Sequence, residues 1–278
     1  MFRALRSHWP EYLMEAALLG LFMVSAGLFG TLLGHPQSPA HRAVADAFVR
    51  RLLMGVAMGL TAVGLIYSPW GRQSGAHFNP ATTLTFWRLG KVAGWDALFY
   101  AAAQFAGGLA GALLVAGLLG GRFLDPPVSA VATRPGDHGA GVAFAAEVAI
   151  TFLLMSVVLV VSNAPRLSRY TGLFVGALVC GFITFEAPLS GMSMNPARTF
   201  ASALPGHVWA GAWVYFTAPP LGMLAAAQAY LALRGGDAVR CAKMHHGNDK
   251  RCIFCGFPGL EAAAGRTVND ARVFGKSA

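Results

Sequence analysis

Charged residues are scarce in this chain of 278 residues: Asp, Glu, Lys and Arg make up only 12% of it, whereas 55% is hydrophobic. Soluble globular domains carry about a quarter charged residues, so the shortage argues against a soluble protein. Cysteine is also rare, with four residues of which three lie after residue 240. This distribution excludes the disulfide framework of a small secreted domain.

Acidic residues are the scarcer charges, with 12 Asp and Glu against 21 Lys and Arg. A basic excess can indicate a nucleic-acid partner, but here the basic residues lie in the C-terminal tail and in short loops, where membrane topology places them. We therefore expect a lipid bilayer and no nucleic acid as partner. The first apolar run ends at 34–36 without the small-residue pattern of a cleavage site, and no nucleophile–base constellation accompanies the apolar runs. We expect neither a cleaved leader nor an enzyme.

Six apolar segments approach or reach the length of about 20 residues that a helix needs to cross a bilayer. All of them contain Gly or Ala, which favours close contacts between helices in lipid. The third contains Gly107 and Gly111 at the spacing typical of a tight helix–helix crossing. The six segments are 13–34, 48–68, 94–118, 142–162, 171–189 and 210–233.

The tripeptide Asn-Pro-Ala occurs twice, each time after a membrane-length segment. Asn is a strong helix N-cap, and Pro fits the first helical position, where its missing N–H costs nothing. The stretches that follow, 81–87 and 197–204, are too short to span a bilayer. Each copy therefore predicts a half-helix whose positive end points into the protein. The two copies are Asn79, Pro80 and Ala81, and Asn195, Pro196 and Ala197.

Three segments and one half-helix form each half of the chain. An odd number of spans per half turns the second half upside-down relative to the first, as in an inverted repeat with discontinuous helices. Glu15 and Glu147 occupy matching places in the two halves. The predicted fold is therefore an all-α integral membrane protein with six transmembrane helices and two re-entrant half-helices. The predicted divisions are an N-terminus at 1–12, a channel domain at 13–233 with repeats at about 13–118 and 142–233, and a tail at 234–278.

These features resemble the aquaporin (major intrinsic protein) family over about residues 10–234. The resemblance implies the aquaporin fold, a homotetramer with one pore per subunit, and no required cofactor. It implies that Glu15 and Glu147 brace the loops before the half-helices. His77 is expected to orient the first loop, with a solvated loop histidine or a pH gate as alternatives. Gln104 is expected to bind a half-helix loop, with a generic interhelical hydrogen bond as the alternative.

Two half-helices that enter from opposite faces put two positive dipole ends at the centre of a pore, each about half an elementary charge. Irregular backbone at this depth survives where it lines a wet cavity, so the loops would present a ladder of carbonyl acceptors. Neutral solutes exchange their water shell for this ladder, whereas ions and protons are excluded. The resemblance adds Arg198 as one wall of an outer constriction and a further barrier to cations.

The resemblance also supplies the other positions of this selectivity filter. Counting from the second tripeptide gives Met192 and Ile183. The position on the second segment is Met58 if the stretch 68–73 contains one extra residue, and Gly59 if it does not; the local pattern favours Met58.

This filter departs from both main classes of the resembled family. Water channels usually place an aromatic and a His at these positions, and glycerol channels place two aromatics and an Asp after the Arg. Here the residues are Met and Ile, and Thr199 follows the Arg. The combination is most similar to nodulin-type and related bacterial members. We therefore expect water and small uncharged solutes, such as glycerol and undissociated metalloid acids, as partners of a passive channel.

The distribution of Lys and Arg predicts the orientation. With both termini in the cytoplasm, 15 of these residues lie inside and 6 outside; without the tail the numbers are 7 and 6. This agrees with the positive-inside rule and with the resemblance. We expect a bacterial inner (cytoplasmic) membrane with both termini cytoplasmic.

The tail contains a candidate metal site. Its three cysteines and a histidine would provide four soft ligands, as in a structural Cys₃His zinc site. Ordinary tail thiols, or palmitoylated or redox-active cysteines, remain as alternatives. The last dozen residues have few apolar anchors and are predicted to be disordered. The candidate ligands are Cys241, His245, Cys252 and Cys255.

Two other functional classes remain open. A proton- or ion-coupled secondary transporter of a small neutral solute can share the inverted repeat, and its coupling site would have to use Glu15, Glu147 or Glu186. A structural membrane protein with a closed pore is the other alternative.

Overall fold

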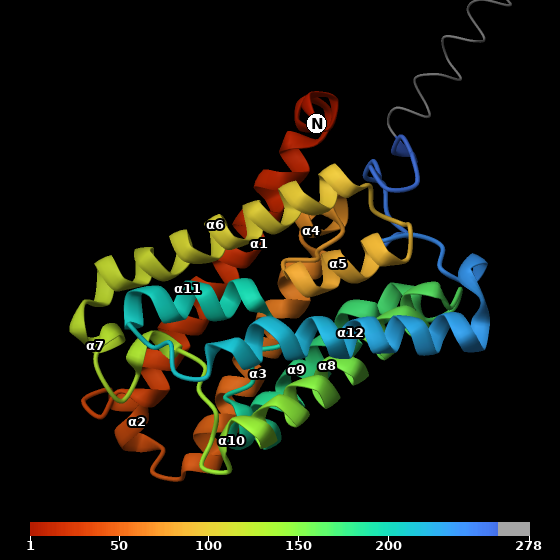
Figure 1. Cartoon of the computed structure of the whole chain (residues 1–278). Helices are drawn as coiled ribbons and strands as arrows, with labels where there is room; N and C mark the ends of the chain where they lie inside the picture. Colours follow the sequence, from red (N-terminus) through yellow and green to blue (C-terminus); the bar gives the residue numbers. More distant parts are fainter. Residues whose placement is uncertain (261–278) are drawn as a thin grey trace, which may run out of the picture.

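The computed structural model describes residues 1–260 and consists, over this range, of helices joined by turns and loops (Figure 1). The disorder predicted for the last dozen residues concerns positions outside the described residues. Six helices in this range are long and apolar enough to cross a membrane, which confirms the predicted all-α class with six spans. These are α1 (Phe2–Gly34), α3 (Ala47–Tyr67), α6 (Gly94–Leu119), α8 (Gly139–Asn163), the segment Ser168–Phe185 that contains α9 (Thr171–Gly181), and α12 (Ala212–Arg234).

The first helix is longer than its apolar pattern indicates. It begins at Phe2, whereas the apolar segment begins at residue 13. Glu11 and Tyr12, in the additional turns, are buried. The apolar run therefore marks the part of the helix suited to lipid, and the polar turns before it extend the same helix beyond that layer.

The fifth span is not a uniform α-helix. It passes from α9 through a π-helical turn, η3 (Phe182–Glu186), into the short α10 (Ala187–Ser190). The π-turn widens the backbone where Ile183 is located, and such turns are frequent at functional sites.

The two half-helices are α5 (Pro80–Arg88) and α11 (Pro196–Gly206). Each begins at the Pro of its tripeptide, and the preceding Asn caps it: the Oδ1 of Asn79 accepts from the N–H of Ala81 at 2.9 Å. Their nine and eleven residues are too few to cross a bilayer. Figure 1 shows α5 and α11 lying nearly end to end in the middle of the molecule.

Short elements connect the long helices. α4 and α10 hold equivalent places in the two halves, because each ends in a left-handed glycine, Gly75 or Gly191. There the chain turns into the loop before a half-helix. The short elements not yet given are α2 (Pro39–Ala43), α4 (Pro69–Ser74), α7 (Gly121–Leu124), η1 (Ser129–Val131), η2 (Ser168–Tyr170) and η4 (Gly236–Ala238).

Glycines bring α1 and α6 into close contact, as the small-residue spacing predicts. A Cβ added to Gly107 would lie 2.0 Å from the carbonyl oxygen of Ala16, and one added to Gly111 would lie 2.2 Å from that of Gly20. Such approaches exclude any larger side chain. This crossing positions α1, which carries Glu15, beside the first half-helix.

The tail does not extend away from the helices. From Gly235 to residue 260 it folds back over one end of the bundle (blue in Figure 1). Val239, Ala242 and Met244 belong to the main hydrophobic core of the molecule. This part of the tail is therefore packed as an integral layer of the structure.

Candidate functional site

Asn79 and Asn195 lie at the junction of the two half-helices. The Nδ2 of Asn79 donates to the carbonyl of Met194, and the Nδ2 of Asn195 donates to the carbonyl of Phe78, each at 2.8 Å. Each half-helix is thus fixed to the loop that precedes the other. A side-chain amide has two N–H donors, so each Asn keeps a second donor for a solute.

The loops before the half-helices have an unusual backbone. Ala76 and Phe78 in the first loop, and Met192 and Met194 in the second, all have positive φ angles. Residues with a Cβ rarely adopt this region, and it persists only where the surroundings enforce it. The alternation of left-handed and extended residues turns the backbone polar groups to opposite sides, with N–H groups toward the buried acids.

Glu15 holds the first loop. Its carboxylate accepts from the backbone N–H of His77 at 3.0 Å and from that of Phe78 at 2.6 Å. It also accepts from Ser74 Oγ at 2.6 Å and from Gln104 Nε2 at 2.8 Å. The side chain is fully buried, and these four donors stabilise its charge.

Glu147 holds the second loop in the same way. Its carboxylate accepts from the backbone N–H of Ser193 and Met194, and from Ser190 Oγ at 2.9 Å. Tyr215 Oη donates to the carbonyl of Ser190, as Tyr100 Oη does to that of Ser74. The two halves therefore repeat the same arrangement of acid, serine and tyrosine.

His77 and Gln104 connect this network to its surroundings. His77 contacts Thr83 Oγ1 through Nδ1 at 3.0 Å and the carbonyl of Ala242 through Nε2 at 2.7 Å. It is 1% exposed, which does not fit the alternative of a solvated loop histidine. Gln104 donates to Thr83 Oγ1 at 3.2 Å as well as to Glu15, so it binds residues of the first half-helix unit directly.

A cavity of about 540 Å³ passes both Asn side chains. At one end it reaches Arg50, Arg51 and Arg198, and we call this end the arginine mouth. At the other end it reaches Met244 in the tail, and we call this end the tail mouth.

All four predicted filter residues line this cavity: Met58, Ile183, Met192 and Arg198. Gly59 instead faces α9, since a Cβ added to it would lie 2.5 Å from the carbonyl oxygen of Gly176. Of the two alternatives for the second segment, Met58 is the residue on the cavity wall. Three of the four side chains are apolar.

Arg198 is held by its backbone, whose N–H donates to Asn195 Oδ1 at 3.2 Å. Within residues 1–260, its buried Nη1 has no hydrogen-bond partner. This leaves a donor for a solute in the cavity.

Sequence reasoning missed other residues of the cavity wall. Arg50, Met54 and Ala62 line it together with Met58. They follow the spacing of about four residues that places side chains on one face of a helix. The same periodicity, counted outward from Met58, could have identified them.

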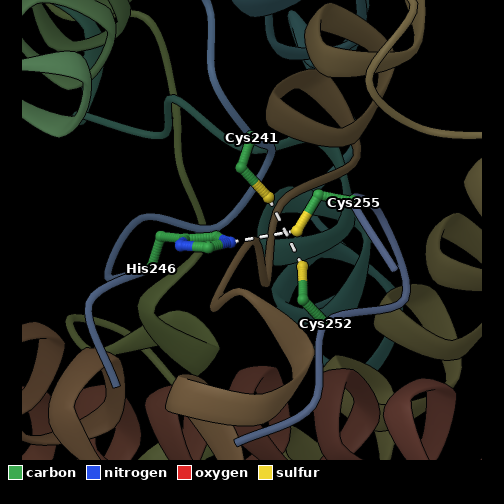
Figure 2. A group of neighbouring side chains, drawn as sticks. All are labelled: Cys241, His246, Cys252 and Cys255. Carbon is green, nitrogen blue, oxygen red and sulfur yellow. Dashed lines mark hydrogen bonds between the residues drawn. The ribbon is translucent and has the colours of Figure 1, made fainter. Parts of the chain in front are cut away.

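The tail brings four soft ligands together (Figure 2). Their ligand atoms all lie within 4.8 Å of one another. The Sγ atoms of Cys241 and Cys252 are 3.4 Å apart, close to the separation of about 3.8 Å expected for two thiolates at 2.3 Å from one tetrahedral zinc. The Nε2 of His246 lies 3.1 Å from the Sγ of Cys255. The hydrogen bond between Cys241 and Cys252 lowers the pKa of the Cys252 thiol and raises that of the Cys241 thiol.

The fourth member of this cluster corrects the prediction, because it is His246 and not His245. The ring of His245 packs edge-on against Tyr67, with centroids 5.2 Å apart. His245 ends a turn, and His246 follows it outside any helix or strand. When His245 packs against α3, its neighbour His246 turns toward the cysteines.

A family model and two related sequences all relate this chain to the major intrinsic proteins. The family model described as Major intrinsic protein matches residues 6–230. The chain is 36% identical to Aquaporin NIP2-3 of Zea mays over 199 residues, which are 71% of this chain and 64% of that protein. It is 40% identical to Aquaporin NIP1-3 of Oryza sativa subsp. japonica over 183 residues, which are 66% and 62% of the two chains. The chain therefore spans a little under two thirds of the length of these relatives.

A solved structure has the same fold. The aquaglyceroporin from Plasmodium falciparum matches with a TM-score of 0.65 and 23% identity, covering 81% of this chain and 96% of that one. The range matched by the family model ends at residue 230, before the tail begins.

Proposed function

The chain belongs to the major intrinsic protein family, and on this premise we propose that it is a passive channel for water and small uncharged solutes. It is an integral membrane protein, since six of its helices can cross a bilayer. No catalytic activity and no cofactor are assigned to the channel itself.

One observation carries this proposal: two capped half-helices meet at Asn79 and Asn195 on the wall of a single cavity. Each helix N-terminus contributes about half a positive charge, which repels cations where the two half-helices meet. The free amide donors orient a central water so that it donates outward on both sides, and this interrupts a proton wire. Neutral solutes meet no such barrier.

We further assign the selectivity filter to Met58, Ile183, Met192 and Arg198. The three apolar side chains offer a solute no N–H or O–H donor, and Met adapts its shape to the solute. Arg198 provides donors and a second barrier to cations. This combination suits small hydroxylated neutral molecules, of which glycerol and undissociated metalloid acids are the candidates.

In the tail we assign a structural zinc site to Cys241, His246, Cys252 and Cys255. Three thiolates and one imidazole form a closed tetrahedral set typical of structural zinc. The turns between residues 239 and 260 have no helix or strand to stabilise them, and a metal ion would supply that stabilisation.

The assembly and orientation follow from the family. We propose a homotetramer in which each subunit has its own pore, with both termini in the cytoplasm. The tail mouth would then face the cytoplasm and the arginine mouth the opposite side. The relatives named above are plant proteins, and they give no support for a bacterial inner membrane.

The channel proposal is tested by stopped-flow swelling of vesicles that contain the purified chain. Water and then glycerol gradients are applied, to zinc-loaded protein and to protein treated with a membrane-permeant chelator. Permeation above protein-free vesicles in at least one of the two conditions, without ion conductance, is the expected result. Absence of water permeation under both conditions would reject the channel.

The filter is tested by the change Ile183→His. The imidazole replaces an apolar wall by a longer, planar ring that hydrogen-bonds water, so the ratio of glycerol to water permeability should fall. Ile183→Leu keeps the volume and the apolar character and serves as the control. An unchanged ratio in the His variant would remove Ile183 from the filter.

The zinc site is tested by metal analysis of the purified chain. One zinc ion per chain is expected, and the double change Cys252→Ser and Cys255→Ser should remove it. Cys180, which lies in α9 away from the cluster, provides the control Cys180→Ser with unchanged zinc. Equal zinc content in all three proteins would exclude these ligands.

A proton- or ion-coupled transporter is the second candidate function, because of the environment of Glu186. Both of its carboxylate oxygens are buried without a hydrogen-bond partner among residues 1–260, whereas Glu15 and Glu147 are saturated with donors. Solute uptake that saturates, follows a proton gradient and is lost in Glu186→Gln would support transport. Uptake independent of the gradient would support the channel, and absence of any flux would favour a structural protein with a closed pore.

A further inference from the structure

Residues 239–257 of the tail, which we call the cap, cover the tail mouth. They lie outside the range 6–230 that the family model matches. The cap thus lies beyond the part of the chain that the family model describes. Its contacts with the channel show what it does there.

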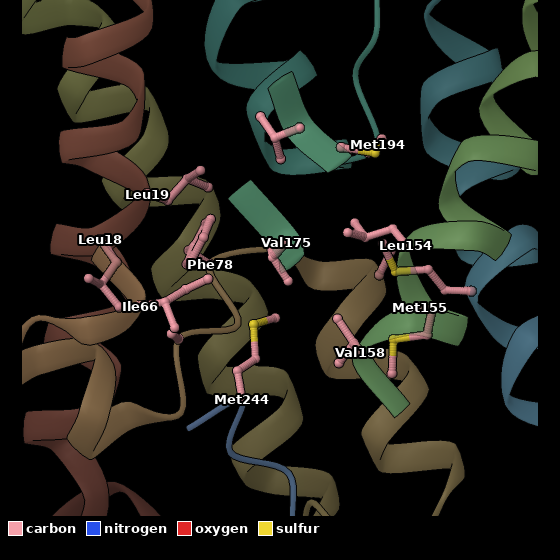
Figure 3. Packing of buried hydrophobic residues seen from close by; sticks show 14 of the residues in the cluster. Leu18, Leu19, Ile66, Phe78, Leu154, Met155, Val158, Val175, Met194 and Met244 are labelled. Carbon is pink, nitrogen blue, oxygen red and sulfur yellow. The ribbon is translucent and has the colours of Figure 1, made fainter. Parts of the chain in front are cut away.

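Met244 lies on the wall of the cavity at the tail mouth. It is 5% exposed and belongs to the same core cluster as Ile66, Val158 and Val175. Figure 3 shows its side chain reaching from the tail between Ile66 and Val158. It is the one described residue of the tail on the cavity wall. An apolar side chain at this place narrows the path and removes water from it.

The cap is fixed to the pore loop itself. The backbone N–H of Met244 donates to the carbonyl of Gly75 at 3.1 Å. The carbonyl of Ala242 contacts His77 Nε2 at 2.7 Å, and the ring of Phe254 stacks on His77 with centroids 5.5 Å apart and planes at 2°. The segment with Met244 and the turn with Phe254 therefore bind the same loop from two sides.

Charged and polar groups tie the rest of the cap to the channel. Arg251 forms two hydrogen bonds of 2.7 Å to the carboxylate of Glu11 in α1. The backbone N–H of Arg240 donates to Asn163 Oδ1 at the end of α8 at 2.7 Å. Within the cap, the buried ammonium of Lys243 donates to the carbonyl of Arg251 at 2.6 Å. The cap thus bridges the first and second halves of the channel.

The metal ligands lie where they would hold this arrangement together. Cys241 and His246 flank Met244 in the sequence, while Cys252 and Cys255 enclose Phe254. An ion bound to all four would join the segment that closes the cavity to the turn that stacks on the pore loop. Without it, the cap would depend on its apolar contacts, its hydrogen bonds and the ion pair of Arg251 with Glu11, because it contains no helix or strand of its own.

We propose that a zinc ion in this cluster locks the cap onto the tail mouth and keeps the channel closed, and that removal of the zinc releases Met244 and opens it. This inference rests on the proposed channel function and on the proposed zinc site. It assigns the cluster a regulatory role: the channel responds to the availability of zinc on the side of the tail.

The experiment uses the full chain in vesicles, with water permeability measured before and after zinc removal by a membrane-permeant chelator. Minor open states typically account for at most about 10% of a population, so removal should raise the permeability at least about tenfold. Readdition of zinc should reverse the rise. Cys180→Ser should behave as the unmodified chain.

Substitutions of Met244 distinguish the blocking effect of its side chain from the effect of zinc binding. Met244→Ala should give high permeability in the zinc-loaded protein while the zinc content stays unchanged. Met244→Leu has a similar volume and should remain closed. Zinc analysis of both variants verifies that the cap is folded.

Each other outcome contradicts a different statement. The zinc-loaded chain, the chelated chain and Met244→Ala could all conduct water at the same rate. Met244 would then not block the tail mouth, whereas the channel function would be supported. If Met244→Ala opens the pore but chelation does not, zinc does not control the cap. If no protein conducts under any condition, the channel function itself fails.

Discussion

At the scale of single residues, two buried carboxylates set the geometry of the pore loops. Glu15 and Glu147 each accept two backbone N–H groups from residues that precede a half-helix. Hydrogen bonds to an ionised group are shorter and stronger than neutral ones. They offset the cost of the left-handed residues in the loops.

Replacing Glu15 by Leu should therefore destabilise the protein strongly. The backbone donors of His77 and Phe78 would be left buried and unpaired, at about 1–3 kcal/mol each. The melting temperature of the protein in detergent should fall by many degrees, and less in Glu15→Gln, which keeps one acceptor.

Glu186→Gln is the matched control for this prediction. This acid is also buried in a spanning segment but has no hydrogen-bond partner in the described part of the chain. The melting temperature of the Glu186→Gln variant should be equal to or above that of the unmodified chain. An unchanged melting temperature in Glu15→Leu would show that the loops do not depend on this acid.

The sequence was sufficient to find the acids but not the histidine that lies beside the three cysteines. Acidic residues in long apolar segments are costly and conspicuous, and the matching places of Glu15 and Glu147 suggested a shared role. The choice between His245 and His246 depends on a tertiary contact with Tyr67. The spacing between ligands in the sequence does not reveal that His245 packs against Tyr67.

At the scale of elements, close packing of α1 against α6 fixes the first half-helix relative to its supporting acid. Gly107 touches the backbone of α1, whereas a Cβ on Gly117 of the same helix would meet no atom within 4 Å. Both glycines weaken the helix to the same extent, but Gly107 is packed against α1 and Gly117 is not.

Gly107→Ala should destabilise the protein, while Gly117→Ala should be neutral or stabilising. Insertion of a methyl group into a packed contact costs about 1–3 kcal/mol, whereas Ala at an open helical position gains up to about 1 kcal/mol over Gly. Thermal unfolding of both variants in detergent checks the difference. Equal melting temperatures would contradict the packing at this crossing.

The half-helices were predictable because local chemistry specifies them: Asn caps and Pro at the first position determine where α5 and α11 begin. The start of α1 was not predictable from its apolar run. Its polar turns are held by tertiary contacts, such as Tyr12 Oη and His8 Nδ1 to the carboxylate of Asp96 at 2.6 and 2.8 Å. The partner lies 84 residues from Tyr12 in the sequence.

At the scale of the whole molecule, the first helix and the tail meet through Glu11 and Arg251. Glu11 is fully buried, and the Arg251 side chain is 42% exposed. A partly exposed ion pair is worth about 1 kcal/mol, which is enough to affect how often the cap opens.

Arg251→Gln should therefore lose zinc to a chelator roughly fivefold faster than the unmodified chain, as expected for about 1 kcal/mol. Arg240→Gln is the control, because Arg240 binds the channel through its backbone N–H and its side chain is exposed. The measurement is the rate of zinc transfer to a coloured chelator. Equal rates in both variants would show that the ion pair does not hold the cap.

The position of the cap was the part that sequence reasoning could not supply. Three of the four proposed ligands follow from the cysteine spacing, but no pattern around Met244 distinguishes it from any other apolar residue. Its place on the cavity wall results from contacts with Gly75 and His77. These residues lie more than 150 positions away in the sequence.

The two mouths differ in chemistry, so different classes of reagent should act on the protein from the two sides of the membrane. Arg50, Arg51 and Arg198 at the arginine mouth should attract oxyanion blockers, whereas the thiols of the cap should react with mercurials and alkylating reagents. Impermeant reagents of the first kind would inhibit from one side of the membrane only. Those of the second kind would act solely from the other side, and would activate rather than inhibit.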